Sequence, residues 1–159
     1  MLSKVILYLL LGFGFAYAHG QNVTGKVVGV VDGDTFKLLT KDTTLHVVRL
    51  ANIDCPEKQQ PYSVKAKQFV SQAIFQKEIT IQVLKRDRYR RLIAQAYYND
   101  SLLLNYKLVR EGLAWNYVKY SKDTILQTLE REARELRKGL WADQNPIPPW
   151  EWRDKKSKQ

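Results

Sequence analysis

Short apolar segments separated by tight turns make up the first half of the chain. Segments rich in β-branched and other apolar side chains, as these are, favour β-strands. They are residues 23–31, 35–39 and 43–50. The intervening sequences Asp32-Gly33-Asp34 and Lys41-Asp42 are typical of tight turns, because Asp and Gly tolerate the backbone geometry that such turns require. This pattern predicts three strands in a β-meander.

The spacing of apolar residues changes after a loop at residues 51–61. Residues 62–75 repeat apolar side chains every three or four positions, which predicts a helix. Residues 78–84 and 92–98 return to alternation and predict two further strands, joined by a charged turn at residues 85–91.

Two more helices are expected after the fifth strand. Residues 103–113 have helical spacing and end near Gly112. Asp123 is a good N-cap for a third helix. We expect its apolar stripe to comprise Ile125, Leu129, Ala133, Leu136 and Leu140. Prolines then end regular structure, and Trp150 and Trp152 are expected to attach the tail to the domain.

Five strands, with one helix between the third and fourth and others after the fifth, follow the order of an OB-fold barrel. The expected fold class is therefore α+β, mainly β: a five-stranded Greek-key barrel with about three helices. We divide the 159 residues into a leader at 1–18, one domain at 19–145 and a Pro-, Trp- and Lys-rich tail at 146–159.

The leader has the three-part layout of a secretory signal peptide. A positive charge at Lys4 precedes an apolar run over residues 5–15, and Ala16-Tyr17-Ala18 gives a small-x-small cleavage pattern. The run is shorter than the roughly 20 residues that a membrane-spanning helix needs, which favours a signal peptide over an anchor. We therefore expect a secreted or periplasmic protein, without stable membrane insertion after cleavage.

Charge and residue counts restrict the chemistry. Lys and Arg total 26 against 16 Asp and Glu, a net charge of +10, which suits nucleic acid or an anionic membrane surface but also serves solubility. Cys55 is the single cysteine, so a disulfide within the chain and a zinc site made of several cysteines are excluded. The two histidines, His19 and His46, show no catalytic or metal-binding spacing. A general base is therefore expected to be a carboxylate.

Two aspartates are candidates for a cation site. Asp34 follows the first strand and its turn, and Asp54 follows the third strand. If these strands are neighbours, both carboxylates reach one end of the barrel, where they suit Ca²⁺ better than Mg²⁺ or Mn²⁺. Pro56 favours an extended backbone at Cys55, which would turn the Cys55 carbonyl toward the ion. The other interpretation is that residues 32–34 form only a hairpin turn.

Arginines and a glutamate near these aspartates suit phosphoryl transfer, which needs a positioned nucleophile and positive charge around the phosphorus. Arg49 precedes the Asp54 loop, and a second basic cluster occupies residues 87–91. A guanidinium can bond two phosphate oxygens at once. Glu57 would activate or position water. Alternatively, each arginine is a solvated surface charge and Glu57 a turn residue.

Aromatic side chains lie among these charges, at Tyr89, Trp115, Tyr117 and Tyr120. Such rings can stack on nucleic-acid bases without sequence preference. Packing in the core is the alternative, and for Trp115 the two interpretations are equally favoured.

Together these features resemble the staphylococcal nuclease (thermonuclease) family, over about residues 23–141. The motifs that carry the resemblance are V-V-D-G-D-T-F-K-L at 30–38, R-L-A-N-I-D-C-P-E at 49–57 and D-R-Y-R-R-L at 87–92, followed by R-E-G-L-A at 110–114 and G-L-W at 139–141. Each motif alone is weak, but the first three in this order and spacing are specific.

The resemblance implies Ca²⁺-dependent cleavage of DNA and RNA to 3′-phosphate and 5′-hydroxyl ends. By position, it implies the following residues: Asp34, Asp54 and the Cys55 carbonyl as metal ligands; Arg49 and Arg91 as transition-state arginines; Glu57 as the residue that activates water; and Tyr89 near the base. We add Arg88 and Tyr117 as substrate-binding candidates.

Three departures from the family pattern bear on this assignment. Arg90 stands where the best-known member has Gly, which leaves Arg90 open as an alternative to Arg91, although the spacing from Asp87 favours Arg91. The loop at residues 58–62 is short, and residues 115–120 align only loosely.

Three functions are weighed. The leading hypothesis is an exported, monomeric, metal-dependent nuclease. The second is an OB-fold protein that binds nucleic acid without cutting it, which the filled charged positions argue against. The third is a basic protein that binds anionic envelope surfaces. It is disfavoured because the helix after Asp123 mixes Glu with Arg.

Overall fold

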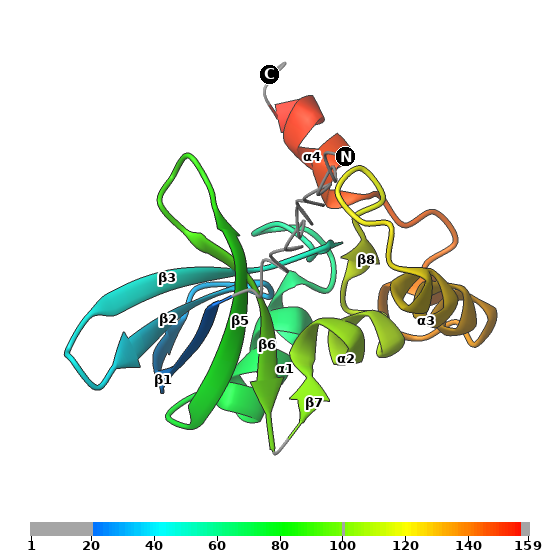
Figure 1. Cartoon of the computed structure of the whole chain (residues 1–159). Coiled ribbons are helices and arrows are strands. Elements are labelled where there is room, and N and C mark those ends of the chain that lie inside the picture. The colour runs from blue at the N-terminus through cyan, green and yellow to red at the C-terminus, as the bar shows by residue number, and fades with distance from the viewer. Residues whose placement is uncertain (1–20, 100, 157–159) are drawn as a thin grey trace, which may run out of the picture.

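The computed structural model describes residues 21–99 and 101–156 (Figure 1). Five long strands form the barrel: β1 (Gln21–Val30), β2 (Thr35–Thr40), β3 (Leu45–Leu50), β5 (Glu78–Arg86) and β6 (Leu92–Tyr98). They pair in the order β3-β2-β1-β5-β6, all antiparallel, and a parallel pairing of β3 with β6 closes the barrel. The predicted five-stranded barrel is confirmed.

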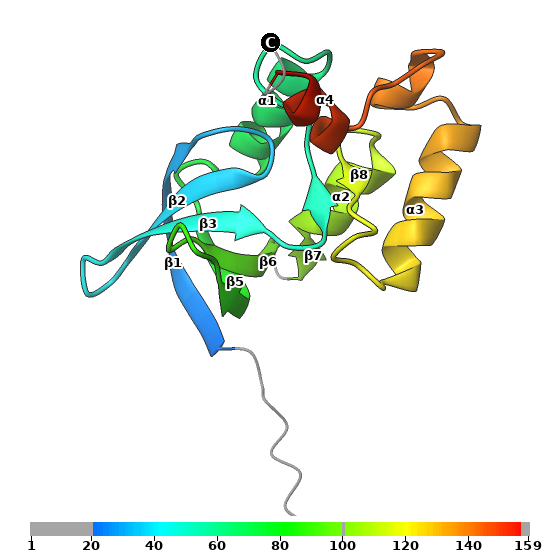
Figure 2. The same ribbon diagram turned by 90° about the horizontal axis from the view of Figure 1, so that it is seen from above.

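Helices and three short strands complete the domain. The short strands are β4 (Ile53–Asp54), β7 (Leu102–Leu103) and β8 (Trp115–Asn116). The helices are α1 (Ser63–Ile74), α2 (Leu104–Arg110), α3 (Thr124–Glu135), the 3₁₀ turn η1 (Gly139–Ala142) and α4 (Pro149–Lys156). The three predicted helices are present. The expectation that the prolines end regular structure is wrong, because α4 begins at Pro149 within the predicted tail. Figures 1 and 2 show the barrel on one side of the molecule and α2 and α3 on the other.

The barrel interior is filled by the inward faces of the strands and covered by α1 and α2. Its fully buried residues include Phe36, Leu38, Val48, Ile81, Val70 and Leu108. Burial of this much apolar surface is the main force that holds the strands together. Pairing shifts between Val27 and Gly29 and between Val83 and Lys85 mark bulges, which curve β1 and β5 enough for β3 and β6 to meet.

Helix α3 begins as predicted and buries Leu129 and Ala133 of the expected stripe, but two expected positions are exposed. The Asp123 side chain accepts hydrogen bonds from the backbone N–H groups of Ile125 and Leu126, as an N-cap does. The expected positions Ile125 and Leu136 are 52% and 67% exposed, so that part of the prediction is wrong. Leu126 is buried in place of Ile125, together with the predicted Leu129 and Ala133. Leu140 is buried, but from η1.

The predicted signal peptide, residues 1–18, lies outside the described residues. Among the residues that are described, no helix combines the length and apolar character needed to cross a membrane.

Candidate active site

A cleft of about 600 Å³ opens at the end of the barrel, between the β1–β2 turn, the end of β3 and the loop before α1. It gathers predicted site residues from three distant parts of the sequence. They are Asp34, Arg49, Asp54, Cys55, Glu57 and Arg91. Asp32, Thr35, Lys58 and Lys67 also line it.

The β1–β2 turn fixes the Asp34 carboxylate. The Asp34 backbone N–H donates to Asp32 Oδ1 at 3.0 Å, a hydrogen bond that shapes the turn. Thr35 Oγ1 donates to Asp34 Oδ1 at 3.0 Å, and the Cys55 backbone N–H donates to Asp34 Oδ2 at 2.9 Å. This last bond joins the turn directly to the Asp54 loop, so the two aspartates lie together as expected. The expected reason is wrong, because the first and third strands are not neighbours: β2 lies between them.

Gly33 permits the close packing of this turn against the Asp54 loop. A Cβ atom at position 33 would lie 2.8 Å from the Cβ atoms of both Ala66 and Cys55, closer than such atoms approach. Burial raises the pKa of the Cys55 thiol well above its usual range, so the side chain is an inert packing group. The Cys55 contribution to the site is therefore restricted to its backbone.

Arg49 connects the two aspartates from the end of β3. Its Nη1 donates to the backbone carbonyls of Leu50 at 2.9 Å and Ile53 at 3.1 Å, and lies 3.2 Å from Asp34 Oδ2. Its Nη2 donates to Asp54 Oδ1 at 2.8 Å. Burial would lower the pKa of Arg49, but the charges of Asp34 and Asp54 outweigh it and raise that pKa. The side chain is only 14% exposed and is held on several sides.

A second arginine contacts Asp54, from a part of the chain that carries none of the site predictions. Arg153 on α4 donates from Nη2 to Asp54 Oδ2 at 2.8 Å and from Nη1 to Glu57 Oε1 at 2.5 Å. Burial raises the pKa of Asp54, although hydrogen bonding from Arg153 and the charge of Arg49 act in the opposite direction. Arg153 therefore contacts both a predicted metal ligand and the predicted base.

Arg91 reaches the cleft from the other side, at the start of β6. Its Nε donates to Asp87 Oδ2 at 2.8 Å, and its side chain is 31% exposed. Arg90 is exposed and is not among the residues that line the cleft. Its φ of 66° is in the left-handed region, which explains why a Gly suits this position in a relative. The geometry thus favours Arg91 over Arg90.

Comparison with known proteins identifies the architecture. The family described as "Staphylococcal nuclease homologue" matches residues 47–143. This chain belongs to that family. An "Uncharacterized endonuclease" of Escherichia coli O157:H7 is 39% identical over 135 residues, which span 85% of this chain and 88% of that protein. An "Uncharacterized endonuclease" of Haemophilus influenzae is 42% identical over 130 residues, spanning 82% and 72% respectively. A "Micrococcal nuclease" of Shigella flexneri is 37% identical over 139 residues, spanning 81% and 79%.

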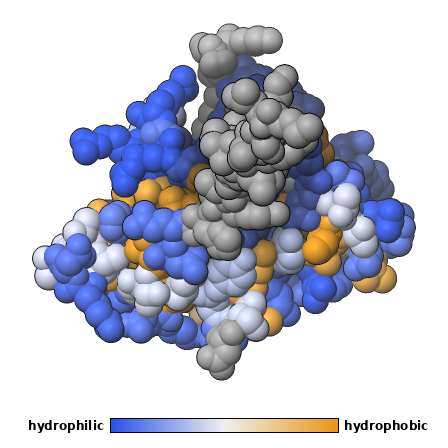
Figure 3. All heavy atoms as spheres, viewed as in Figure 1, coloured by the Kyte–Doolittle hydropathy of each residue, from blue (hydrophilic) through white to orange (hydrophobic). Residues whose placement is uncertain are grey.

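The substrate-binding candidates of this staphylococcal nuclease homologue lie outside the cleft. Tyr89 and Arg88 are exposed on the β5–β6 turn, where the guanidinium groups of Arg88 and Arg91 lie 4.8 and 5.6 Å from the centre of the Tyr89 ring. This turn belongs to a protruding hairpin that is strongly hydrophilic in Figure 3. Tyr117 is half-buried, and one face of its ring is stacked on Trp150 of α4, with 5.2 Å between ring centres.

The cleft offers oxygen atoms that suit a hard cation, but its described residues supply too few side-chain ligands to complete the coordination. Asp34, Asp54 and the Cys55 carbonyl would supply oxygens, which Ca²⁺ prefers. In residues 21–99 and 101–156 no group of three or more His, Cys, Asp or Glu side chains is arranged to hold a metal ion. Backbone and water oxygens would have to complete such a site, as is common for Ca²⁺.

Sequence reasoning missed two residues of the site, Arg153 and Asp32. The signal for Arg153 is its position directly after Trp150-Glu-Trp152, since large aromatic residues in a tail indicate docking. Burial and the neighbouring Asp34 charge raise the pKa of Asp32 to about 6. The sequence signal for Asp32 is its place two residues before Asp34, within one turn.

Proposed function

We propose that the chain, a nuclease by family, hydrolyses phosphodiester bonds of DNA and RNA in a Ca²⁺-dependent reaction that leaves 3′-phosphate and 5′-hydroxyl ends. The observation that carries the proposal is the single cleft in which two aspartates, Glu57, Arg49 and Arg91 meet from three distant segments. A phosphodiester is an anion that gains further negative charge in the transition state, and such a cleft can both bind it and stabilise that charge.

Each side chain has a distinct task in this scheme. Glu57, at the mouth of the cleft with 37% of its side chain exposed, accepts a proton from the attacking water. Arg49 lies in β3 and Arg91 directly before β6, and both donate hydrogen bonds to the phosphoryl oxygens. Backbone carbonyls hold Nη1 of Arg49 and Asp54 holds Nη2, which keeps the guanidinium oriented at the cleft.

Asp34, Asp54 and the carbonyl of Cys55 would hold the cation. When bound, Ca²⁺ supplies positive charge that polarises the phosphate. Asp34 is already oriented by Thr35 and the Cys55 backbone, so little rearrangement of this carboxylate is needed. The exposed pair Arg88 and Tyr89 extends the binding surface toward neighbouring nucleotides by charge and stacking. Tyr117, whose ring is stacked on Trp150 on one face, is a further candidate for contact with a base.

We further propose that residues 1–18 direct export and are then removed, so that a monomeric enzyme acts in the periplasm or outside the cell. Determining the N-terminal residue of protein recovered from the extracytoplasmic fraction tests this, with His19 as the expected first residue.

The decisive experiment is product analysis of an oligonucleotide labelled at either end, incubated with the protein in Ca²⁺ and, in parallel, with EDTA. We expect cutting in Ca²⁺ alone, with 3′-phosphate and 5′-hydroxyl products. Glu57→Gln should slow turnover by several orders of magnitude while the protein remains folded. Binding without cutting in Ca²⁺ would instead support the non-catalytic OB-fold hypothesis, and wild-type rates in Glu57→Gln would refute the assigned base.

A further inference from the structure

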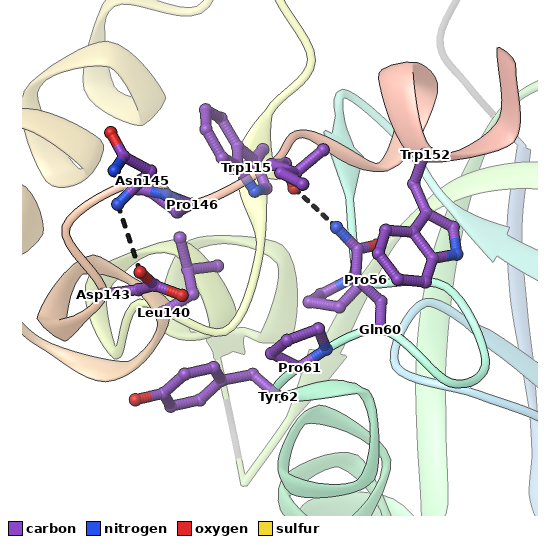
Figure 4. Close-up of a pocket in the computed structure, with 11 residues that line it drawn as sticks. Pro56, Gln60, Pro61, Tyr62, Trp115, Leu140, Asp143, Asn145, Pro146 and Trp152 are labelled. Atoms are coloured by element: carbon purple, nitrogen blue, oxygen red, sulfur yellow. Dashed lines mark hydrogen bonds between the residues drawn. The ribbon is translucent and has the colours of Figure 1, made fainter. Parts of the chain in front are cut away.

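The C-terminal helix α4 is fixed to the domain by specific contacts beside the active site. Trp150 stacks on Tyr117 with an interplanar angle of 2° and lies edge-on to Trp115, 5.6 Å between centres. Just before the helix, the Ile147 carbonyl accepts a hydrogen bond from Gln60 Nε2 at 2.5 Å. Figure 4 shows Trp152 and Gln60 close together around a small cavity that Pro56 also lines. These contacts hold α4 against the loop that carries Asp54 and Glu57.

This docking directs Arg153 at the carboxylates that the proposed reaction needs. Asp54 Oδ2 is bonded to Arg153 and Asp54 Oδ1 to Arg49. Both oxygens of Asp54 therefore already have a guanidinium partner. Arg153 also bonds Glu57.

The two arginines that bond the Asp54 carboxylate differ in how easily a cation could displace them. Arg49 is 14% exposed and also bonds two backbone carbonyls and Asp34, so its departure would break a network. Arg153 is 41% exposed, and its hydrogen bonds within the described part of the chain go to Asp54 and Glu57. Water can replace the carboxylates around a half-exposed guanidinium far more readily than around a buried one.

We propose that Arg153 is an internal counter-cation that occupies the metal ligand Asp54 and the base Glu57 until a divalent cation displaces it. The inference rests on the proposed function, because it concerns the same cation site. Cation binding would then also release Glu57 for water, so that the base becomes available only in the metal-loaded enzyme. Arg153 thereby sets the Ca²⁺ concentration at which the enzyme becomes active.

The test is calorimetric titration of CaCl₂ into full-length protein without nucleic acid, comparing wild type, Arg153→Gln and the control Lys155→Gln. Lys155 is exposed on the same helix, so its substitution removes one positive charge from α4 without touching Asp54. Arg153→Gln should bind Ca²⁺ about tenfold more tightly than wild type, since a charge-assisted hydrogen bond no longer competes. Lys155→Gln should shift the affinity much less. The Ca²⁺ concentration for half-maximal cleavage should fall in parallel in Arg153→Gln.

The outcomes separate this inference from the proposed function. Equal affinity in wild type and Arg153→Gln, with Ca²⁺-dependent cutting, would refute the competition and leave the nuclease proposal standing. Weaker binding by Arg153→Gln would also overturn it, and would make Arg153 an organiser of the site. If Lys155→Gln raised the Ca²⁺ affinity as much as Arg153→Gln, the loss of any positive charge on α4 would explain the change, and a specific role of the Arg153 contact would be refuted. Absence of Ca²⁺ binding in all three proteins would overturn both proposals.

Discussion

Two turns of similar local design flank the cleft, yet their aspartates behave in opposite ways. Asp32 accepts the backbone N–H of Asp34 at 3.0 Å, and Asp87 accepts that of Tyr89 at 2.9 Å. Burial and the neighbouring Asp34 raise the pKa of Asp32 to about 6. Burial acts in the same direction on Asp87, but hydrogen bonds from Arg91 outweigh it and lower that pKa.

The two turns have similar backbone hydrogen bonds, so burial and the charged residues around each aspartate, and not the turn, decide whether its pKa is raised or lowered. The β1–β2 side concentrates carboxylates, with Arg49 as the buried positive charge that connects them. The β5–β6 side is exposed and basic, and its cleft-lining arginine, Arg91, forms an ion pair with Asp87. The first side is thus suited to a cation and the second to a polyanion.

The largest expected effect on stability comes from removing Arg49, which forms ion pairs with both Asp34 and Asp54. Arg49→Ala leaves Asp34 without its ionic partner and Asp54 with only the half-exposed Arg153, so we expect the free energy of unfolding to fall by about 3–5 kcal/mol. Cleavage should fall roughly 10²-fold or more as well. Chemical denaturation in EDTA and in Ca²⁺ measures the first effect, and Ca²⁺ should restore part of the loss. A destabilisation below about 1 kcal/mol would show that Arg49 is not the structural link.

The next effect depends on pH. Because the folded-state pKa of Asp32 is raised from 3.8 to about 6, its ionisation costs stability above pH 6 and costs nothing below about pH 4. Asp32→Asn should therefore stabilise the metal-free protein at pH 7, by at most about 3 kcal/mol, and the gain should disappear as pH falls from 6 to 4.

Asp87→Asn is the matched control, because the pKa of Asp87 is lowered. Its ionised form contributes stability above pH 3.8, which is lost as pH falls through the folded-state value. The variant should therefore be less stable than wild type at pH 7. If both asparagine variants changed stability in the same direction, the contrast between the turns would be wrong.

Arg91→Ala tests the exposed side of the cleft. We expect kcat/KM to fall roughly 10²-fold, since the donor that we propose for the transition state is lost. Stability should change by less than about 1 kcal/mol, because the pair with Asp87 is partly exposed. Arg90→Ala is the control and should cut at nearly the wild-type rate. If Arg90→Ala lost most of the cleavage activity and Arg91→Ala little, Arg90 and not Arg91 would be the transition-state arginine.

The smallest effect concerns backbone geometry in the same turn. Arg90 has a φ of 66°, which costs a side-chain-bearing residue about 1–2 kcal/mol. Arg90→Gly removes this strain but increases the freedom of the unfolded chain, so a net gain of about 0.5–1 kcal/mol is expected by chemical denaturation. Arg90→Ala keeps the strain and should show no gain. A destabilised Arg90→Gly would mean that the side chain itself supports the turn.

The barrel and the cleft were predictable because the relevant signals are local. Alternation marks the strands, and Asp34, Arg49 and Asp54 stand at or next to strand ends. Pairing of β2 with β3 places Asp34 beside Arg49, and the hydrogen bonds of Cys55 with Asp34 and of Arg49 with Asp54 add the Asp54 loop. The start of the α3 stripe was predicted wrongly, because Ile125 and Leu126 are adjacent and both apolar. Only packing of α3 against α2 decides which of the two turns inward.

Arg153 could not be predicted for a different reason. Its position depends on contacts between α4 and residues far away in the sequence, such as Tyr117 and Gln60, and no periodic pattern encodes these. A short helix rich in charged residues at the end of a chain is typical of a mobile terminus. The two tryptophans indicated attachment, but not which side chain the attachment would deliver to the cleft.

The parallel pairing of β3 with β6 has a consequence for how activity arises during folding. This pairing spans only residues 48–50 and 92–94, and it brings Arg49 of one strand beside the segment that begins just after Arg91. Until β3 pairs with β6, Arg49 and Arg91 belong to separate hairpins and cannot both contact one phosphate. Recovery of cleavage after dilution from denaturant therefore reports the closing of the barrel, and should lag behind the formation of the individual hairpins.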